Sequence, residues 1–136
     1  MRILVVDDSE PWRQRVCSIL QTRPEFRVVA EAVDGLEAVE KAQAVNPDAI
    51  LLDLGLPNLN GLEAAKRIRQ LAPEAKIVFL TQNRDRDVVR AALSDGAHGY
   101  ILKVDAGTEL LTAVDAVVGG VYFLSSGIET DDSDKT

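Results

Sequence analysis

The sequence lacks several features that define large classes of protein. Its single cysteine, Cys17, cannot form an internal disulfide, which fits a reducing compartment and predicts a cytoplasmic location. No apolar run approaches the roughly 20 residues that a membrane-spanning helix needs, so no membrane segment is expected. The apolar start at residues 3–6 is too short for a signal peptide and ends in two acids. The single histidine, His98, has no clustered ligand partners and is expected to pack or to lie on the surface.

Basic charge is also scarce. Lys and Arg number 15 against 22 Asp and Glu, and the net charge is −7. A protein that binds nucleic acid directly presents a basic face, so direct nucleic-acid binding by this chain is not expected. Much of the acidity lies in the last residues. We expect residues 1–124 to form one folded domain and residues 125–136 to form an acidic flexible tail.

What the sequence does contain is a regular alternation of apolar and helical segments. Short continuous apolar runs favour strands that are buried on both faces of a parallel sheet. We expect five such strands, at residues 3–6, 26–30, 49–52, 76–80 and 99–102. Each is followed by apolar residues at helical spacing, which predicts helices on both faces of the sheet and right-handed crossovers. The expected fold class is α/β and flavodoxin-like, a doubly wound (βα)5 arrangement with a five-stranded parallel sheet of order 2-1-3-4-5.

Capping residues set the expected helix boundaries. Ser9 can cap the first helix, with Pro11 in its first turn, and the spacing predicts a helix to about Thr22. Thr108 is expected to cap the last helix, which continues to about Val118.

Polar residues stand at the ends of four of the expected strands. They are Asp7 and Asp8 after the first strand, Asp53 after the third, Thr81 after the fourth and Lys103 after the fifth. In a sheet of order 2-1-3-4-5 the first and third strands are neighbours beside the switch point, where open α/β sheets bind their ligands. Asp53 by itself could simply open a turn. Five polar residues at one sheet edge are better explained as a site.

The chemistry of this set follows from its charges. Clustered carboxylates repel one another, so a divalent cation should stabilise the site, and oxygen ligands with open water positions suit Mg²⁺. For the same reason, Asn in place of Asp7 or Asp8 is expected to raise the melting temperature without Mg²⁺. A carboxylate such as Asp53 can act as nucleophile toward a phosphoryl group and form an acyl phosphate. Lys103 can neutralise one phosphoryl oxygen, and Thr81 can donate a hydrogen bond to another.

These residues and their surroundings resemble the receiver domain of two-component response regulators. The resemblance covers about residues 2–122 and is carried by residues 4–8, 52–57, 61, 80–81, 96–97 and 99–103. It implies that Asp53 accepts a phosphoryl group from a sensor histidine kinase. It also implies that Asp8, Asp53 and the carbonyl of Gly55 bind Mg²⁺, while Asp7 acts through water. The domain would then be a phosphate acceptor with intrinsic autodephosphorylation rather than a turnover enzyme.

The resemblance also implies a conformational switch and a class. Thr81 and Tyr100 would form the switch pair, with the ring of Tyr100 turning inward once Thr81 engages the phosphate. Residues 119–125 resemble the end of NarL/FixJ (LuxR-type) receivers, where a linker to a DNA-binding helix-turn-helix domain begins. We therefore expect a receiver that controls transcription through an absent output domain, and a homodimer on phosphorylation. The alternatives are a stand-alone receiver and a pseudo-receiver that signals without phosphorylation.

Two positions depart from the usual receiver pattern. Lys103 is followed by Val104 where receivers usually have a proline with a cis peptide bond. A cis bond before a non-proline residue costs about 2.5–4 kcal/mol, so a trans bond is expected. Gln82 follows Thr81 where a small residue is common, and the longer side chain can cover the phosphoryl group or change water access. The lifetime of the phosphorylated form is therefore left open.

Two other classes of function are disfavoured by the first strand end. A phosphatase of the haloacid dehalogenase type needs a second Asp two positions after the first, where this chain has Ser9. A flavodoxin-like cofactor module needs a phosphate loop rich in Ser, Thr and Gly. The Asp7-Asp8 pair would repel a phosphate in the absence of a metal.

Overall fold

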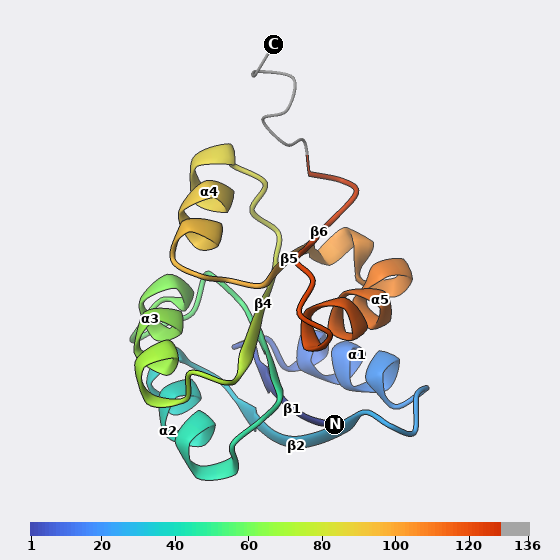
Figure 1. Cartoon of the computed structure of the whole chain (residues 1–136), viewed down its shortest axis with the longest axis horizontal. Coiled ribbons are helices and arrows are strands. Elements are labelled where there is room, and N and C mark those ends of the chain that lie inside the picture. The colour runs from blue at the N-terminus through green and yellow to red at the C-terminus, as the bar shows by residue number, and fades with distance from the viewer. Residues whose placement is uncertain (129–136) are drawn as a thin grey trace.

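The computed structural model describes residues 1–128 of the 136-residue chain. The strands are β1 (Arg2–Val6), β2 (Arg27–Ala32), β3 (Ala49–Leu52), β4 (Lys76–Thr81), β5 (Gly99–Leu102) and β6 (Phe123–Leu124). The helices are α1 (Glu10–Leu20), α2 (Gly35–Val45), α3 (Gly61–Leu71), α4 (Arg86–Ser94) and α5 (Ala106–Val118), with the 3-10 turn η1 (Lys103–Asp105) before α5. All neighbouring strands pair in parallel, in the order β2-β1-β3-β4-β5-β6 (Figure 1). The expected fold class and the order of the first five strands are confirmed.

The five expected strands are present, and the sheet has one further short strand. The short strand β6 extends the sheet beyond β5, where the Phe123 N–H donates to the His98 carbonyl at 3.1 Å and the Ser125 N–H donates to the Tyr100 carbonyl at 2.9 Å. The backbone groups at an exposed strand edge lack hydrogen-bond partners. The strand β6 provides such partners for β5. Two residues are too short a run to be recognised as a strand from apolar periodicity.

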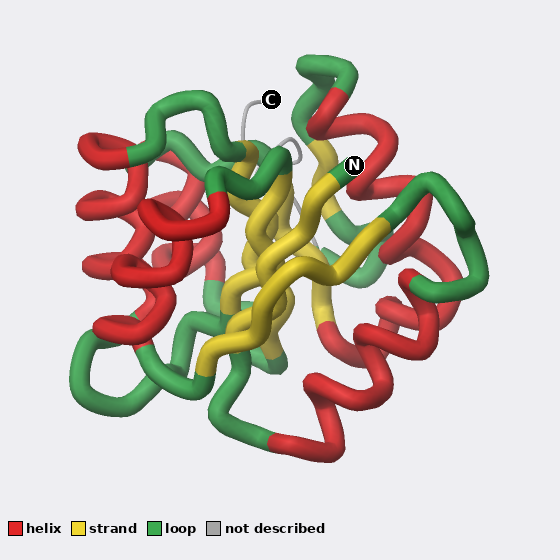
Figure 2. Tube along the Cα trace, turned by 90° about the horizontal axis from the view of Figure 1, so that it is seen from below, coloured by secondary structure: helices red, strands yellow, loops and turns green. Residues whose placement is uncertain are grey.

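Two apolar cores lie on opposite faces of the sheet because successive side chains of a strand alternate between its faces. Leu4, Ile50 and Ile77 belong to the core beneath α2, α3 and α4. Their chain neighbours Leu51 and Val78 belong to the core beneath α1 and α5. Figure 2 shows the helices flanking the strands on both sides. This double cover explains why the strands read as continuous apolar runs.

The first helix begins as expected, and the last one does not. The Ser9 hydroxyl accepts the Trp12 N–H at 3.4 Å, and Pro11 lies in the first turn. The helix ends at Leu20, slightly before the expected Thr22. The last helix begins at Ala106 rather than after Thr108, because η1 runs directly into it. The Thr108 hydroxyl instead donates to the Asp105 carbonyl at 3.2 Å.

The first residues of the expected tail pack against the domain. Ser125 and Ile128 are buried against the domain, so residues 125–128 pack as part of the fold. The remainder of the expected tail, residues 129–136, lies outside the described residues. No helix in the described part of the chain is long and apolar enough to cross a membrane.

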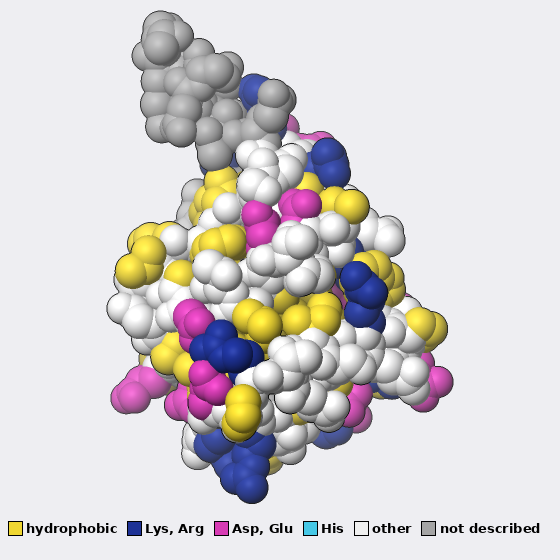
Figure 3. All heavy atoms as spheres, turned by 90° about the vertical axis from the view of Figure 1, so that its right-hand side faces the viewer, with side chains coloured by type: hydrophobic (Ala, Val, Ile, Leu, Met, Phe, Trp, Pro, Cys, Tyr) yellow, Lys and Arg dark blue, Asp and Glu magenta, His cyan; other side chains and the backbone are white. Residues whose placement is uncertain are grey.

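The surface over α1 and α5 carries both charge signs. Acidic and basic side chains are interspersed there with apolar and uncharged ones (Figure 3). This face therefore does not offer the continuous basic surface that a nucleic-acid backbone would require.

Candidate functional site

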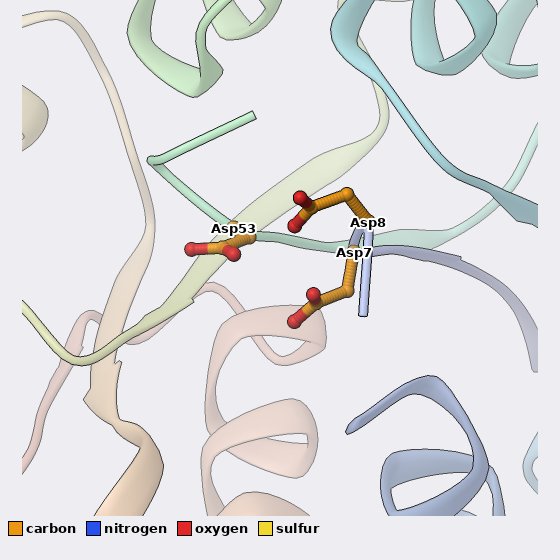
Figure 4. A group of neighbouring side chains, drawn as sticks. All are labelled: Asp7, Asp8 and Asp53. Carbon is orange, nitrogen blue, oxygen red and sulfur yellow. The ribbon is translucent and has the colours of Figure 1, made fainter. Parts of the chain in front are cut away.

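The carboxyl ends of the central strands bring three carboxylates together. Val6 pairs with Leu52 in the β1–β3 register, so the residues that follow, Asp7 and Asp53, lie at the same level of the sheet. Asp7, Asp8 and Asp53 each offer an oxygen within 4.8 Å of the others. Figure 4 shows the three side chains leaving the segments after β1 and β3 and projecting to the same side.

Lys103 reaches this cluster from β5. Its ammonium lies 2.8 Å from Asp7 Oδ2 and 3.4 Å from Asp53 Oδ2. The Lys103 side chain is buried, and so are Asp7 and Asp53, so these charges interact with little solvent screening. One cation thus faces two buried anions, and the site carries an excess of negative charge.

The surroundings of Asp53 also affect the pKa of its carboxyl. Asp53 is only 9% exposed, and burial is the main factor that raises the pKa of its carboxyl. The Lys103 ammonium lowers the pKa of Asp53, while the nearby Asp7 carboxylate raises it again. The Gly55 N–H donates to Asp53 Oδ1 at 3.3 Å and orients the carboxylate. Removing negative charge from Asp53, or adding positive charge beside it, would therefore stabilise the site.

Thr81 and Tyr100 are linked through one loop residue. The Thr81 hydroxyl oxygen accepts the Asn83 N–H at 3.2 Å, a bond that does not use the hydroxyl's own proton. The Tyr100 hydroxyl donates to the Asn83 carbonyl at 2.7 Å. The Tyr100 ring is fully buried in this conformation, and burial, followed by Asp85 and Asp53, raises its pKa to about 12. The phenol therefore remains a hydrogen-bond donor at neutral pH.

A cavity opens onto Asp53 from the side of β4 and α3. Its volume is about 580 Å³, and its lining includes Asp53, Gly55, Thr81, Gln82 and Lys103. A group bound there can contact the Asp53 carboxylate, the Thr81 hydroxyl and the Lys103 ammonium at once. The exposed Gln82 side chain lies at its rim.

The carboxylate cluster fits a magnesium ion. Mg²⁺ prefers oxygen ligands in an octahedral arrangement at about 2.0–2.1 Å. Asp7, Asp8 and Asp53 offer three oxygens within 4.8 Å of one another, which would move closer together to bind one ion directly. Exposed Asp8 offers an open side toward solvent, where water could complete the coordination.

Several residues that shape the site were not singled out from the sequence. The Ser9 N–H donates to Asp7 Oδ1 at 2.8 Å, and the Arg13 guanidinium donates to the Asp7 carbonyl at 2.8 Å. The first contact is an Asx-type bond, which the Asp-Asp-Ser order after a strand could have signalled. The ring of Trp12 lies 4.9 Å from the Lys103 ammonium. Asn83 had no recognisable signal, because its backbone rather than its side chain makes the contacts.

Gly61 has a structural reason that the sequence alone did not supply. A Cβ there would lie 2.3 Å from the Asp53 carbonyl oxygen, so only glycine allows α3 to begin so close to the segment after β3. The peptide bond between Lys103 and Val104 is trans, as expected, since the described residues contain no cis peptide bond.

This fold and this site are those of a signalling domain. The chain matches the family model of the response regulator receiver domain over residues 3–115, and it belongs to that family. The receiver is of the NarL/LuxR type, as its relatives indicate. The resemblance noted from the sequence is thus confirmed.

The relatives include transcription regulators. The transcriptional regulatory protein DegU of Brevibacillus brevis is 40% identical over 123 residues, which are 90% of this chain and 52% of that protein. The nitrate/nitrite response regulator protein NarL of Escherichia coli K12 is 38% identical, over 93% of this chain and 58% of that protein. The chain therefore spans little more than half the length of these relatives.

Solved structures agree with this assignment. A two-component response regulator of the LuxR family from Aurantimonas sp. SI85-9A1 is 33% identical, with a TM-score of 0.92 over 98% of this chain and 96% of that chain. The response regulator domain of Thermotoga maritima CheB is 34% identical, with a TM-score of 0.82 over 88% of this chain and 96% of that chain.

Proposed function

We propose that this receiver takes a phosphoryl group from a sensor histidine kinase onto Asp53 with the help of Mg²⁺, and that this changes its conformation. The observation that carries the proposal is the placement of a buried, negatively crowded Asp53 against a cavity that also presents Thr81 and Lys103. A carboxylate that served only to open a turn would gain nothing from these neighbours.

Asp53 supplies the nucleophile in this reaction. One of its carboxylate oxygens attacks the phosphorus of a phosphohistidine or of acetyl phosphate. The bond from phosphorus to the donor nitrogen or oxygen breaks, and its electron pair leaves with the donor. Lys103 shifts from its carboxylate partners toward a transferred phosphoryl oxygen, and the Thr81 hydroxyl donates its proton to another.

The carboxylates of Asp7, Asp8 and Asp53 would hold the metal, with the Gly55 carbonyl as a further oxygen ligand and Asp7 acting through water. Bound Mg²⁺ supplies positive charge that offsets the charge on the transferred group. The burial of Asp7 and Asp53, both at 9% or less exposure, supports this role, because Lys103 supplies one positive charge for two buried carboxylates.

Thr81 and Tyr100 are proposed as the switch pair. When Thr81 turns toward a phosphoryl oxygen, it weakens its bond with the Asn83 N–H, which moves the loop whose carbonyl holds the Tyr100 hydroxyl. The Tyr100 ring already lies inward in this structure, so the change at Thr81 would act on the hydrogen bond between the Tyr100 hydroxyl and the Asn83 carbonyl rather than turn the ring.

The transcriptional role is proposed from the relatives, which are named as transcription regulators. This chain would control DNA binding through an output domain rather than bind DNA itself, and would form a homodimer on phosphorylation. The cytoplasmic location and the autodephosphorylation stay predictions.

Acetyl phosphate with Mg²⁺ tests the proposal. Intact mass should show one added phosphate in the wild type and none in Asp53→Asn. Asp48→Asn is the matched control, since Asp48 lies at the other end of β3, and its adduct should form as in the wild type. An adduct that survives Asp53→Asn would refute the assignment. Loss of the adduct in both variants would indicate damage to the fold, and its absence even in the wild type would favour the pseudo-receiver.

A further inference from the structure

Residues 125–128, the last that the structure describes, form a segment that two carboxylates hold, and we call it the exit segment. The Ser125 hydroxyl contacts the Asp105 carboxylate and lies 2.9 Å from Glu109 Oε1. The Ser126 N–H donates to Glu109 at 3.2 Å, and the Gly127 N–H donates to Asp105 Oδ2 at 3.2 Å. We call Asp105 and Glu109, with the residues 125–127 that they bind, the carboxylate clip.

The clipped segment is also packed into the domain. Ser125 is 2% exposed, and Ile128 belongs to the same apolar core as Tyr100 and Leu102. A Cβ on Gly127 would lie 2.7 Å from Asp105 Oδ2, so a larger residue there would require the Asp105 side chain to shift. The clip is thus a fitted contact, formed by three hydrogen-bond donors of one segment on two anions of another.

The single 3-10 turn η1 connects the clip to the phosphate-acceptor site. Asp105 is the last residue of η1, and Lys103 is the first. Lys103 is buried against Asp7 and Asp53 at one end of this turn, and Asp105 binds the exit segment at the other. Val104 between them is 75% exposed, so packing of its side chain does little to fix the turn. Only Val104 therefore separates Lys103, whose ammonium contacts the two carboxylates, from Asp105.

We propose that the carboxylate clip couples the charge state of the Asp53 site to the exit segment and holds that segment while the site is empty. The proposal rests on the proposed function. A phosphoryl group on Asp53 draws Lys103 away from Asp7, and the turn moves with it. The clip fits the position of the turn in the unloaded site, so loading the site weakens the clip and frees residues 125–128.

Coupling of this kind is reciprocal. If loading the site weakens the clip, then removing the clip must make loading easier, by at most the same factor. This gives two independent measurements on the same 136-residue protein. Beryllofluoride with Mg²⁺ serves as the phosphoryl mimic in both.

Amide hydrogen exchange of Ser126 and Gly127 measures the clip directly. In the wild type we expect exchange to be about fivefold faster with beryllofluoride and Mg²⁺ than without. Ser125→Ala should exchange about fivefold faster even in the empty site, because a hydroxyl bond to a charged group is lost. Ser126→Ala is the matched control: Ser126 takes part in the clip through its backbone N–H, which alanine keeps, so its exchange should match the wild type.

Beryllofluoride affinity measures the reciprocal effect. Ser125→Ala should bind the mimic about threefold more tightly than the wild type, and Ser126→Ala should bind it equally. Glu109→Gln, which keeps the shape of the side chain, should reproduce Ser125→Ala if that variant folds poorly. Unchanged or slower exchange on loading would overturn the coupling while leaving the proposed function intact. If no beryllofluoride binds to the wild type, the proposed function fails and the coupling fails with it.

Discussion

The two ends of β3 carry the same residue type in opposite circumstances. Asp48 precedes the strand and is exposed, and its Oδ2 accepts the Arg2 N–H at 2.7 Å while its own N–H donates to the Arg2 carbonyl at 2.8 Å. Asp53 follows the strand and is buried beside a second carboxylate. Asp48 joins β3 to β1 by hydrogen bonds at the amino end of the sheet. Burial of Asp53 at the carboxyl end lowers the free energy of unfolding.

The amino end of β3 thus contributes to folding stability, whereas the carboxyl end carries the candidate functional site. Because burial raises the pKa of Asp53 more than the Lys103 ammonium lowers it, the folded state binds this proton more tightly than the unfolded chain does. Ionisation of Asp53 as the pH rises through its folded pKa therefore works against folding. The amino end of the sheet contributes to stability, whereas the carboxyl end stores repulsion that a bound cation or phosphoryl chemistry can relieve.

Removal of the Lys103 charge should give the largest loss of unfolding free energy and the clearest difference between the two ends of the sheet. Lys103→Met leaves Asp7 and Asp53 without their cation, and breaking a buried ion pair in this way costs about 3 kcal/mol of folding free energy. Lys76→Met at the amino end should cost less than about 0.5 kcal/mol, as a surface substitution does. Urea unfolding without Mg²⁺ measures both. Equal losses would mean that the carboxyl end is no more charge-dependent than the amino end.

Neutralising Asp8 should act in the opposite direction. Asp8 is exposed and adds negative charge to the cluster, so Asp8→Asn should raise the melting temperature without Mg²⁺ by about 3 °C. The sequence predicts the same for Asp7→Asn. The structure does not support that, because Asp7 is the nearest carboxylate to the Lys103 ammonium, and we expect Asp7→Asn to lower the melting temperature. Thermal unfolding of the two variants in EDTA checks the contrast, and a decrease for Asp8→Asn would contradict the crowding of the carboxylates.

A pH dependence of opposite sign is expected at the amino end of the sheet. His98 Nδ1 accepts the Ile77 N–H at 3.1 Å, which only the neutral ring can do, and burial, with help from Lys76 and Arg69, lowers the His98 pKa. The unfolded chain then binds the proton more readily, so stability is lost as the pH falls below about 6.5.

His98→Asn tests this dependence, because an amide oxygen can accept the same N–H without titrating. Between pH 7.5 and 5.5 the urea midpoint of the wild type should fall more than that of His98→Asn. Parallel curves would show that His98 does not titrate differently in the folded and unfolded states.

The smallest effect on folding is expected at Gln82. Its exposed side chain lines the cavity beside Asp53, so Gln82→Ala should leave stability within about 0.5 kcal/mol of the wild type. We expect the phosphorylated form to decay roughly threefold faster, because water reaches the acyl phosphate more easily through the open rim. Intact mass followed over time after removal of acetyl phosphate measures the decay. A longer lifetime in Gln82→Ala would mean that Gln82 assists hydrolysis rather than shielding the phosphoryl group.

Most of the fold could be predicted because its signals are local. Apolar runs at residues 3–6, 49–52 and 99–102 are buried on both faces, and each is bounded by a polar residue or a glycine. The structure differed from the prediction where the apolar run was very short and where a neighbouring turn changed the start of a helix. The strand β6 has only two residues, and η1 started the last helix before its expected cap.

The local strand signals also predicted where the candidate site residues lie. They did not predict which side chains pair with one another. The sequence by itself determined that Asp7, Asp53, Thr81 and Lys103 would meet, because parallel strands place their carboxyl ends at one edge. Only the tertiary structure decided how they pair. The choice of Lys103 between two carboxylates, the inward ring of Tyr100 and the binding of residues 125–127 by Asp105 and Glu109 depend on distances between segments far apart in the chain. Periodicity and spacing along the chain carry no record of such distances, which are set when the packed helices and loops fix the side chains.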